Sequence, residues 1–169
     1  MCLLGQSMEV LMLRCGDIPV AHRNIAQGFG FHPTDIILHV GTNDMDIGTP
    51  QGVADDLCKL AEAAVRKYGC DVHVSQLTSR NDRFSKEALR ANELIEAQSQ
   101  LLEGVQLIKH PHLSPRHVYD DKHLDRYRCG QDELSATQIF SIDLFKGVYG
   151  MAPPTQIVKS SRRWFNPKA

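Results

Sequence analysis

The feature that most constrains the fold is a short apolar run that ends abruptly in turn-forming and polar residues. Residues 36–40 are Ile-Ile-Leu-His-Val, and Gly41, Thr42, Asn43 and Asp44 follow directly. A short apolar run that is bounded by turn formers is typical of a buried β-strand. The polar residues would then lie at the carboxyl end of that strand, where open α/β sheets bind ligands. The sequence therefore predicts a site at this edge of a sheet.

The segment at residues 41–44 has two interpretations. In the first, Asn43 offers a side-chain amide, which is both donor and acceptor, at the mouth of a crevice. In the second, the segment forms only a turn and a helix cap, because Gly, Thr, Asn and Asp all favour such positions. Local chemistry alone favours the second interpretation, so the choice depends on the rest of the chain.

A second motif lies near the other end of the chain, where Asp120 precedes His123 by three positions. Gly-Thr-Asn-Asp after a strand, followed later by Asp-x-x-His, resembles the SGNH, or GDSL, hydrolase family of lipases and esterases. The resemblance covers about residues 9–150. It implies that Asn43 donates to the oxyanion, that His123 is the general base and that Asp120 orients His123. It also implies a three-layer α/β/α sandwich with a mostly parallel sheet.

Other positions extend or complicate this resemblance. A glycine after the family's second strand contributes its backbone N–H to the oxyanion hole, and Gly16 matches it, although a plain strand-to-helix turn is the alternative. Asp121 and Asp125 also flank His123, so they are alternative orienting carboxylates. The loop at residues 78–83 is expected at the same sheet edge, where the resemblance makes Arg80 and Asn81 candidates for lining the substrate site.

The nucleophile block of the family is Gly-Asp-Ser, and its only cognate here is Gly-Gln-Ser, which ends at Ser7. An expected strand at residues 8–13 follows at once. That leaves no room for the crossover of about a dozen residues that a parallel neighbouring strand requires. The sequence thus predicts that the family's first strand is missing. Ser7 remains as the candidate nucleophile, and an exposed sheet edge would favour self-association.

Periodicity and turn signals predict alternating strands and helices, which is the pattern of an α/β domain. Asp17 is the candidate N-cap of the first helix, and Gly69 is the candidate C-cap of the second. In the third helix we expect an inner face with contributions from Leu89, Asn92, Leu94, Ile95 and Leu101, and we interpret Asn92 as structural. The expected strands are residues 8–13, 36–40, 70–77 and 104–109, and the expected helices are residues 18–27, 51–68, 84–102 and 133–148.

Composition indicates one globular domain at residues 1–150, followed by a basic tail at residues 151–169. The chain has 169 residues, 42% of them hydrophobic and 23% charged, and its net charge is −1. It is long enough to bury a core, and its charge gives no general attraction to nucleic acid or membranes. We expect a cytoplasmic location, because no apolar run could span a bilayer and no signal peptide is visible. An incomplete N-terminus would leave that expectation open.

Neither cysteine nor histidine spacing suggests a metal site. The five cysteines are odd in number and form no C-x-x-C pair, which disfavours a disulfide framework and a zinc site. His110, His112 and His117 share a loop but have no acidic or cysteine partners at ligand spacing. A nucleotide cofactor is also unexpected, because the chain has no glycine-rich phosphate loop. We therefore expect reduced thiols, no metal and no cofactor.

Two classes of function follow from these observations. The first is a hydrolase of small carboxylic esters. The second is a catalytically inactive binding module on the same fold, for nucleic acid or a protein partner. SGNH-like domains with His-Val-Gly-Thr-Asn-Asp also accompany animal retroelement proteins. In the tail, Arg162 and Arg163 precede Trp164 and Phe165, and such basic–aromatic interleaving can contact nucleic acid.

Overall fold

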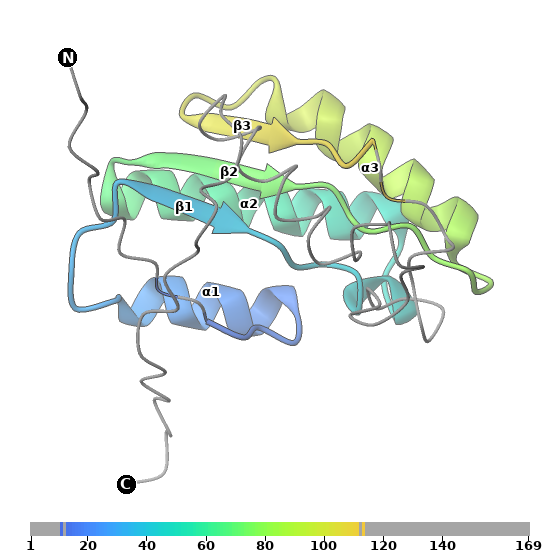
Figure 1. Cartoon of the computed structure of the whole chain (residues 1–169), viewed down its shortest axis with the longest axis horizontal. Helices are drawn as coiled ribbons and strands as arrows, with labels where there is room; N and C mark the ends of the chain where they lie inside the picture. Colours follow the sequence, from blue (N-terminus) through green and yellow to red (C-terminus); the bar gives the residue numbers. More distant parts are fainter. Residues whose placement is uncertain (1–10, 12, 112, 114–169) are drawn as a thin grey trace, which may run out of the picture.

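The computed structural model of the protein describes residues 11, 13–111 and 113 (Figure 1). Three strands form a parallel sheet in the order β1-β2-β3. Helices α2 and α3 make the two crossovers that parallel strands require. The predicted α/β fold with a parallel sheet is confirmed to this extent. The elements are α1 (Ile18–Gln27), β1 (Asp35–Leu38), the 3₁₀ turn η1 (Asp44–Asp46), α2 (Pro50–Tyr68), β2 (Asp71–Ser75), α3 (Ser85–Ser99) and β3 (Val105–Ile108).

One face of the sheet carries the apolar core. Side chains alternate between the two faces of a strand, so Ile36 and Leu38 of β1 lie on the same face as Val72 and Val74 of β2. These four residues are buried, and they belong to one core that includes residues from all three helices. Within the described residues the structure thus has a helical layer on one face of the sheet. The second helical layer of the expected sandwich stays a prediction.

The opposite face of the sheet is polar toward the carboxyl ends of the strands. His73 and Ser75 of β2 lie on this face and are buried. His73 is packed within the strand, because its side chain is 2% exposed and its Nε2 lies 3.2 Å from Asp35 Oδ1. The central strand β2 therefore places a buried histidine and a buried serine on the face of the sheet opposite the apolar core.

The start of α1 and the end of α2 follow the capping chemistry that the sequence predicts. Asp17 Oδ1 accepts a hydrogen bond of 2.7 Å from the N–H of Val20, so Asp17 is the N-cap of α1. Gly69 ends α2 with a left-handed φ of 59°, which glycine adopts without steric strain. Thr49 caps the other end of α2, where its hydroxyl accepts from the N–H of Gly52 at 3.1 Å.

The predicted inner face of α3 is wrong in two places. Leu89 is 61% exposed, and Leu101 is 84% exposed and lies beyond the end of the helix. The buried stripe consists instead of Ala88, Ala91, Ile95 and Ser99, which recur at helical spacing. Small residues dominate this stripe, so α3 can lie close to its neighbours. The positions of its leucines therefore do not predict which side of the helix faces the core.

Several predictions lie outside the described residues. They include the helix at 133–148, the tail at 151–169 and most of the strand at 8–13. From that strand only Leu11 and Leu13 are described, and both are exposed and in no strand. Among the described elements β1 and β3 are the outer strands, and self-association through an edge stays a prediction. No described helix has the length and apolar character needed to cross a membrane. The described cysteines, Cys15, Cys58 and Cys70, are free thiols.

Candidate functional site

The chain leaves β1 through a turn that only glycine fits well. Gly41 has a φ of 115°, a conformation that residues with a side chain rarely adopt. A Cβ atom at this position would lie 2.9 Å from Cδ2 of Leu77, which is two positions beyond the end of the neighbouring strand β2. The glycine therefore lets the turn after β1 approach the carboxyl end of β2 closely. The residues that follow are held at this shared sheet edge.

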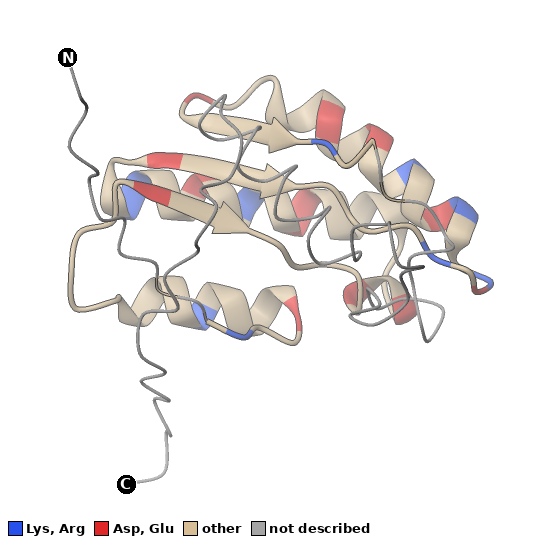
Figure 2. Cartoon of the chain, viewed as in Figure 1, with Lys and Arg blue, Asp and Glu red and all other residues tan. Residues whose placement is uncertain are grey.

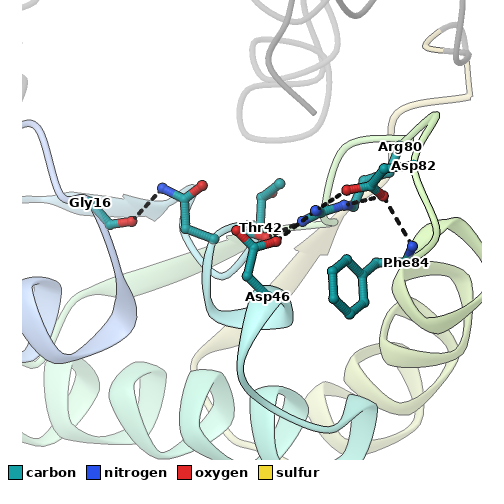
Figure 3. A network of polar contacts seen from close by, with 7 residues as sticks. Gly16, Thr42, Asp46, Arg80, Asp82 and Phe84 are labelled. Atoms are coloured by element: carbon teal, nitrogen blue, oxygen red, sulfur yellow. Dashed lines mark hydrogen bonds and ion pairs between the residues drawn. The ribbon is translucent and has the colours of Figure 1, made fainter. Parts of the chain in front are cut away.

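Asn43 reaches across this edge to Gly16. Its side-chain Nδ2 donates a hydrogen bond of 2.8 Å to the carbonyl oxygen of Gly16, which is 27 positions earlier in the chain. Figure 3 shows this bond as the dashed line that ends at the carbonyl oxygen of Gly16. Asn43 precedes η1, but its side chain makes no capping bond there. The cap interpretation therefore does not describe this side chain, and two of the predicted site residues lie together.

Asp44 attaches the same turn to the beginning of α1. Both of its carboxylate oxygens lie 3.2 Å from the N–H of Ile18, at the positive end of that helix. Burial raises the pKa of Asp44, and the hydrogen bond from Ile18 opposes part of that increase. Asn43 and Asp44 are consecutive, and together they fasten the turn after β1 to residues 16–18.

Arg80 fastens the other side of this turn. The residue is 2% exposed. Its Nη1 donates to the carbonyl oxygen of Thr42 at 2.5 Å, and its Nη2 donates to Asp46 Oδ1 at 2.7 Å (Figure 3). The guanidinium also forms a bidentate pair with Asp82, in which the Nε–Oδ1 distance is 2.9 Å. Arg80 thus joins the loop after β2 to the turn after β1.

Asp82 and Phe84 hold Arg80 in place. Asp82 Oδ1 also accepts from the N–H of Phe84 at 3.1 Å, and Arg80 Cζ lies 5.2 Å from the centre of the Phe84 ring. The hydrogen bonds from Arg80 lower the pKa of Asp82, and the same pair raises the pKa of Arg80. Figure 2 shows the acidic residues of η1 near the basic loop between β2 and α3.

The ion pair of Arg80 with Asp82 makes stability depend on pH in a defined direction. The pKa of Asp82 is lower in the folded protein than in the unfolded chain, where it is about 3.9. Its contribution to the free energy of unfolding is therefore complete above that unfolded pKa and is lost as the pH falls through the folded pKa. Between pH ~5 and ~2 we expect urea titrations to show a steeper loss of stability in the wild type than in Asp82→Asn.

The comparison of these two proteins isolates Asp82. Asp44 has a raised pKa, so its contribution has the opposite sign, but it is present in both proteins and cancels in the difference. Parallel pH profiles for the wild type and Asp82→Asn would contradict the ion pair.

A second polar group lies on the polar face of the sheet, and the sequence did not predict it. Ser75 Oγ lies 2.9 Å from His39 Nδ1 and 2.7 Å from His110 Nε2. Ser75 is fully buried, so it offers no accessible nucleophile. His39 follows the end of β1 and His110 follows the end of β3, so the meeting of these side chains with Ser75 depends on the strand register, which the sequence alone does not give.

The pKa of His39 is lowered to about 4, first by burial and then by the neighbouring His110. By its solvent-accessible surface His39 is an exposed residue, so contact with solvent reduces the part of the pKa shift that burial causes. The second cause follows from the ring centres, which are 6.4 Å apart. The direction of the shift keeps the His39 imidazole neutral at physiological pH, as its hydrogen bond with Ser75 allows.

Beside α3 lies a small hollow of about 170 Å³, whose lining includes Ser79, Arg80 and Leu89. Asn92 also borders it, but its amide is occupied by the backbone of Leu77. Asn92 Oδ1 accepts from the N–H of Leu77 at 2.8 Å, and its Nδ2 donates to the Leu77 carbonyl at 3.0 Å. This confirms the structural interpretation of Asn92. Asn81 is exposed in the same loop.

Of the predicted site residues, the structure brings Asn43 and Gly16 together. Ser7, Asp120 and His123 lie outside the described residues. Within the described part of the chain, no three His, Cys, Asp or Glu side chains are grouped to hold a metal ion. No known protein-family model matches the chain, and no curated protein sequence matches it.

Proposed function

We propose that this chain is an SGNH-hydrolase-like domain that acts on small carboxylic esters at the carboxyl edge of its sheet. One observation carries the proposal. Asn43 and Gly16, which the resemblance assigns to the same oxyanion hole, meet through a hydrogen bond of 2.8 Å although 27 positions separate them. The contact brings these two positions to the same edge of the sheet, as the resemblance expects.

The chemistry of ester hydrolysis explains why such a contact matters. Attack on an ester places negative charge on the carbonyl oxygen, and donors fixed in advance stabilise that charge. One N–H of the Asn43 amide is held by the Gly16 carbonyl, which leaves the other N–H directed elsewhere. In the proposal this N–H and the backbone N–H of Gly16 are the oxyanion donors. Each such donor is worth about 3–4 kcal/mol in the transition state.

The remaining roles belong to residues outside the described part of the chain. Ser7 Oγ attacks the ester carbonyl carbon, and His123 accepts the hydroxyl proton and passes it to the leaving alcohol. Water then hydrolyses the acyl-serine, with His123 again as the base. Asp120 orients the imidazole, whose unperturbed pKa near neutrality suits this task. The assignment of Ser7 as nucleophile depends on the degenerate Gly-Gln-Ser block, so the experiment tests this residue with a variant of its own.

The described residues give less support to a nucleic-acid-binding module. Its sequence support is the basic tail, which lies outside them. Helices α2 and α3 carry both basic and acidic residues (Figure 2), so neither is a uniformly basic element of the kind that binds nucleic acid. If the purified chain does not hydrolyse esters, we conclude that it is a binding module on the same fold.

The experiment is hydrolysis of p-nitrophenyl acetate by the purified chain, beside Ser7→Ala and His123→Ala. We expect His123→Ala to lower kcat by about 100-fold or more, because general base catalysis contributes about 10²–10⁴-fold. Ser7→Ala should abolish turnover if Ser7 is the nucleophile. The rate of p-nitrophenolate release at several pH values measures both effects.

His22→Ala is the matched control, because His22 is an exposed histidine on α1. Exposed imidazoles can hydrolyse activated esters without a built site, and this control measures that background. Wild-type turnover that equals the background, or that survives in His123→Ala, would refute the hydrolase proposal.

A further inference from the structure

We propose that Arg80 is a positioning residue for Asn43, because it holds both ends of the turn that carries this amide. This inference deepens the proposed function and rests on it for its catalytic meaning. Arg80 binds the Thr42 carbonyl, directly before Asn43, and the Asp46 carboxylate, at the end of η1. Arg80 itself belongs to a different loop, after the central strand β2.

The turn between these two attachments is compact. The N–H of Met45 donates to the Gly41 carbonyl at 3.3 Å, and the N–H of Asp46 donates to the Asn43 carbonyl at 3.1 Å. The backbone of Asn43 is therefore inside a hydrogen-bonded turn whose ends are both attached to Arg80. On the far side, Asp44 binds the N–H of Ile18. The direction of the Asn43 amide is thus set by contacts on both sides of the turn.

Arginine suits this task better than lysine. Its planar fork of N–H groups serves Thr42, Asp46 and Asp82 at the same time, whereas the ammonium of lysine is a point charge. Arg80 is 2% exposed, so water does not readily replace these bonds. The bidentate pair with Asp82 fixes the guanidinium plane, which in turn fixes the direction of the bonds to the turn after β1.

The charges around Arg80 argue against a direct role in binding an anionic substrate. Asp46 and Asp82 both pair with its guanidinium, so their two negative charges exceed its single positive charge. Its Nε, Nη1 and Nη2 atoms all donate within the protein. Arg80 borders the hollow beside α3, but its polar atoms bind the turn after β1 and Asp82.

Positioning of this kind has a specific kinetic signature. An oxyanion donor acts at about 2.7–3.1 Å from the oxyanion, and displacement of about 1 Å can cost about 100-fold in rate. Loosening the turn should therefore lower kcat. KM should change little, because the oxyanion exists only in the transition state. A residue that served stability alone would change neither parameter in the folded protein.

The experiment compares Arg80→Lys, Asp46→Ala and Arg90→Ala by ¹⁵N–¹H NMR of the full chain. Arg90→Ala is the matched control, because Arg90 forms an exposed ion pair with Glu93 on α3. We expect the side-chain amide signals of Asn43 to shift and to exchange faster with water in Arg80→Lys and Asp46→Ala. In Arg90→Ala they should be unchanged. Asp46 is partly exposed, so Asp46→Ala tests the turn even if Arg80→Lys unfolds.

Kinetics of p-nitrophenyl acetate hydrolysis add a second readout. We expect kcat to fall by about 10- to 100-fold in Arg80→Lys, with KM within a factor of about two. Unchanged Asn43 signals in folded Arg80→Lys and Asp46→Ala would overturn the positioning role. If these signals move but the wild type has no turnover, the positioning role stands and the hydrolase proposal fails. Turnover in which Arg80→Lys retains full kcat supports the hydrolase proposal and overturns the positioning role.

Discussion

Replacement of Asn43 by alanine is expected to lower kcat for ester hydrolysis by about 100- to 1,000-fold, the usual cost of removing one oxyanion donor. KM should stay within a factor of about two, because the substrate carbonyl carries little charge before attack. The fold should persist, since the variant loses one exposed hydrogen bond to the Gly16 carbonyl. Such a bond contributes about 0.5–1.5 kcal/mol. Steady-state kinetics with p-nitrophenyl acetate measure kcat and KM separately.

Gln51→Ala is a suitable control for this prediction. Gln51 is an exposed residue on α2, and its carboxamide donates to Asp55 at 2.7 Å. The control removes a carboxamide of similar chemistry away from Gly16. If Asn43→Ala retained the wild-type kcat while His123→Ala lost it, the enzyme would use other donors, and the assignment of Asn43 to the oxyanion hole would be wrong.

Each residue of the segment 41–44 contacts a different part of the chain. Gly41 permits the close turn against Leu77, and the carbonyl of Thr42 accepts from Arg80. Asn43 then binds Gly16, and Asp44 binds the N–H of Ile18. A simple helix cap needs only its own helix, whereas this segment joins the loop after β2 to the start of α1. These contacts make the segment a junction between three parts of the chain, and its catalytic role stays a proposal.

The sequence predicted those parts of the fold that depend on neighbouring residues. The start of α1 followed from the Asp17 cap, and the end of α2 followed from Gly69. The strand before Gly41 followed from its apolar run. In each case the determining interactions lie within a few positions along the chain, so a local pattern contains the required information.

The parts that the sequence missed depend on tertiary contacts. Arg80 pairs with Asp46, which is 34 positions away, and Ser75 meets His110, which is 35 positions away. The strand register that brings Ser75 to His110, and the loop positions that bring Arg80 to Asp46, are fixed only when the sheet assembles. The orientation of α3 failed for a related reason, since its close packing is set by Ala88 and Ala91 rather than by its leucines.

The second large effect is expected in stability, from Leu57→Ala in α2. Leu57 is fully buried in the core, and α2 packs against both α1 and α3 as well as against the sheet. Deletion of a buried leucine side chain removes its transfer free energy and leaves a cavity, which together cost about 2–5 kcal/mol. Typical domains have a free energy of unfolding of about 5–15 kcal/mol, so this loss is a large share.

Urea denaturation of wild type, Leu57→Ala and Leu101→Ala measures this difference. Leu101 is 84% exposed, so its truncation should change the free energy of unfolding by no more than about 0.5 kcal/mol. Comparing Leu57→Ala with Leu101→Ala distinguishes the core that the structure shows from the core that the sequence predicted, in which Leu101 was on the inner face of the third helix. Equal losses in both variants would mean that α2 and α3 pack differently. The loop that carries Asn43 leads into α2, so the site would then be placed differently as well.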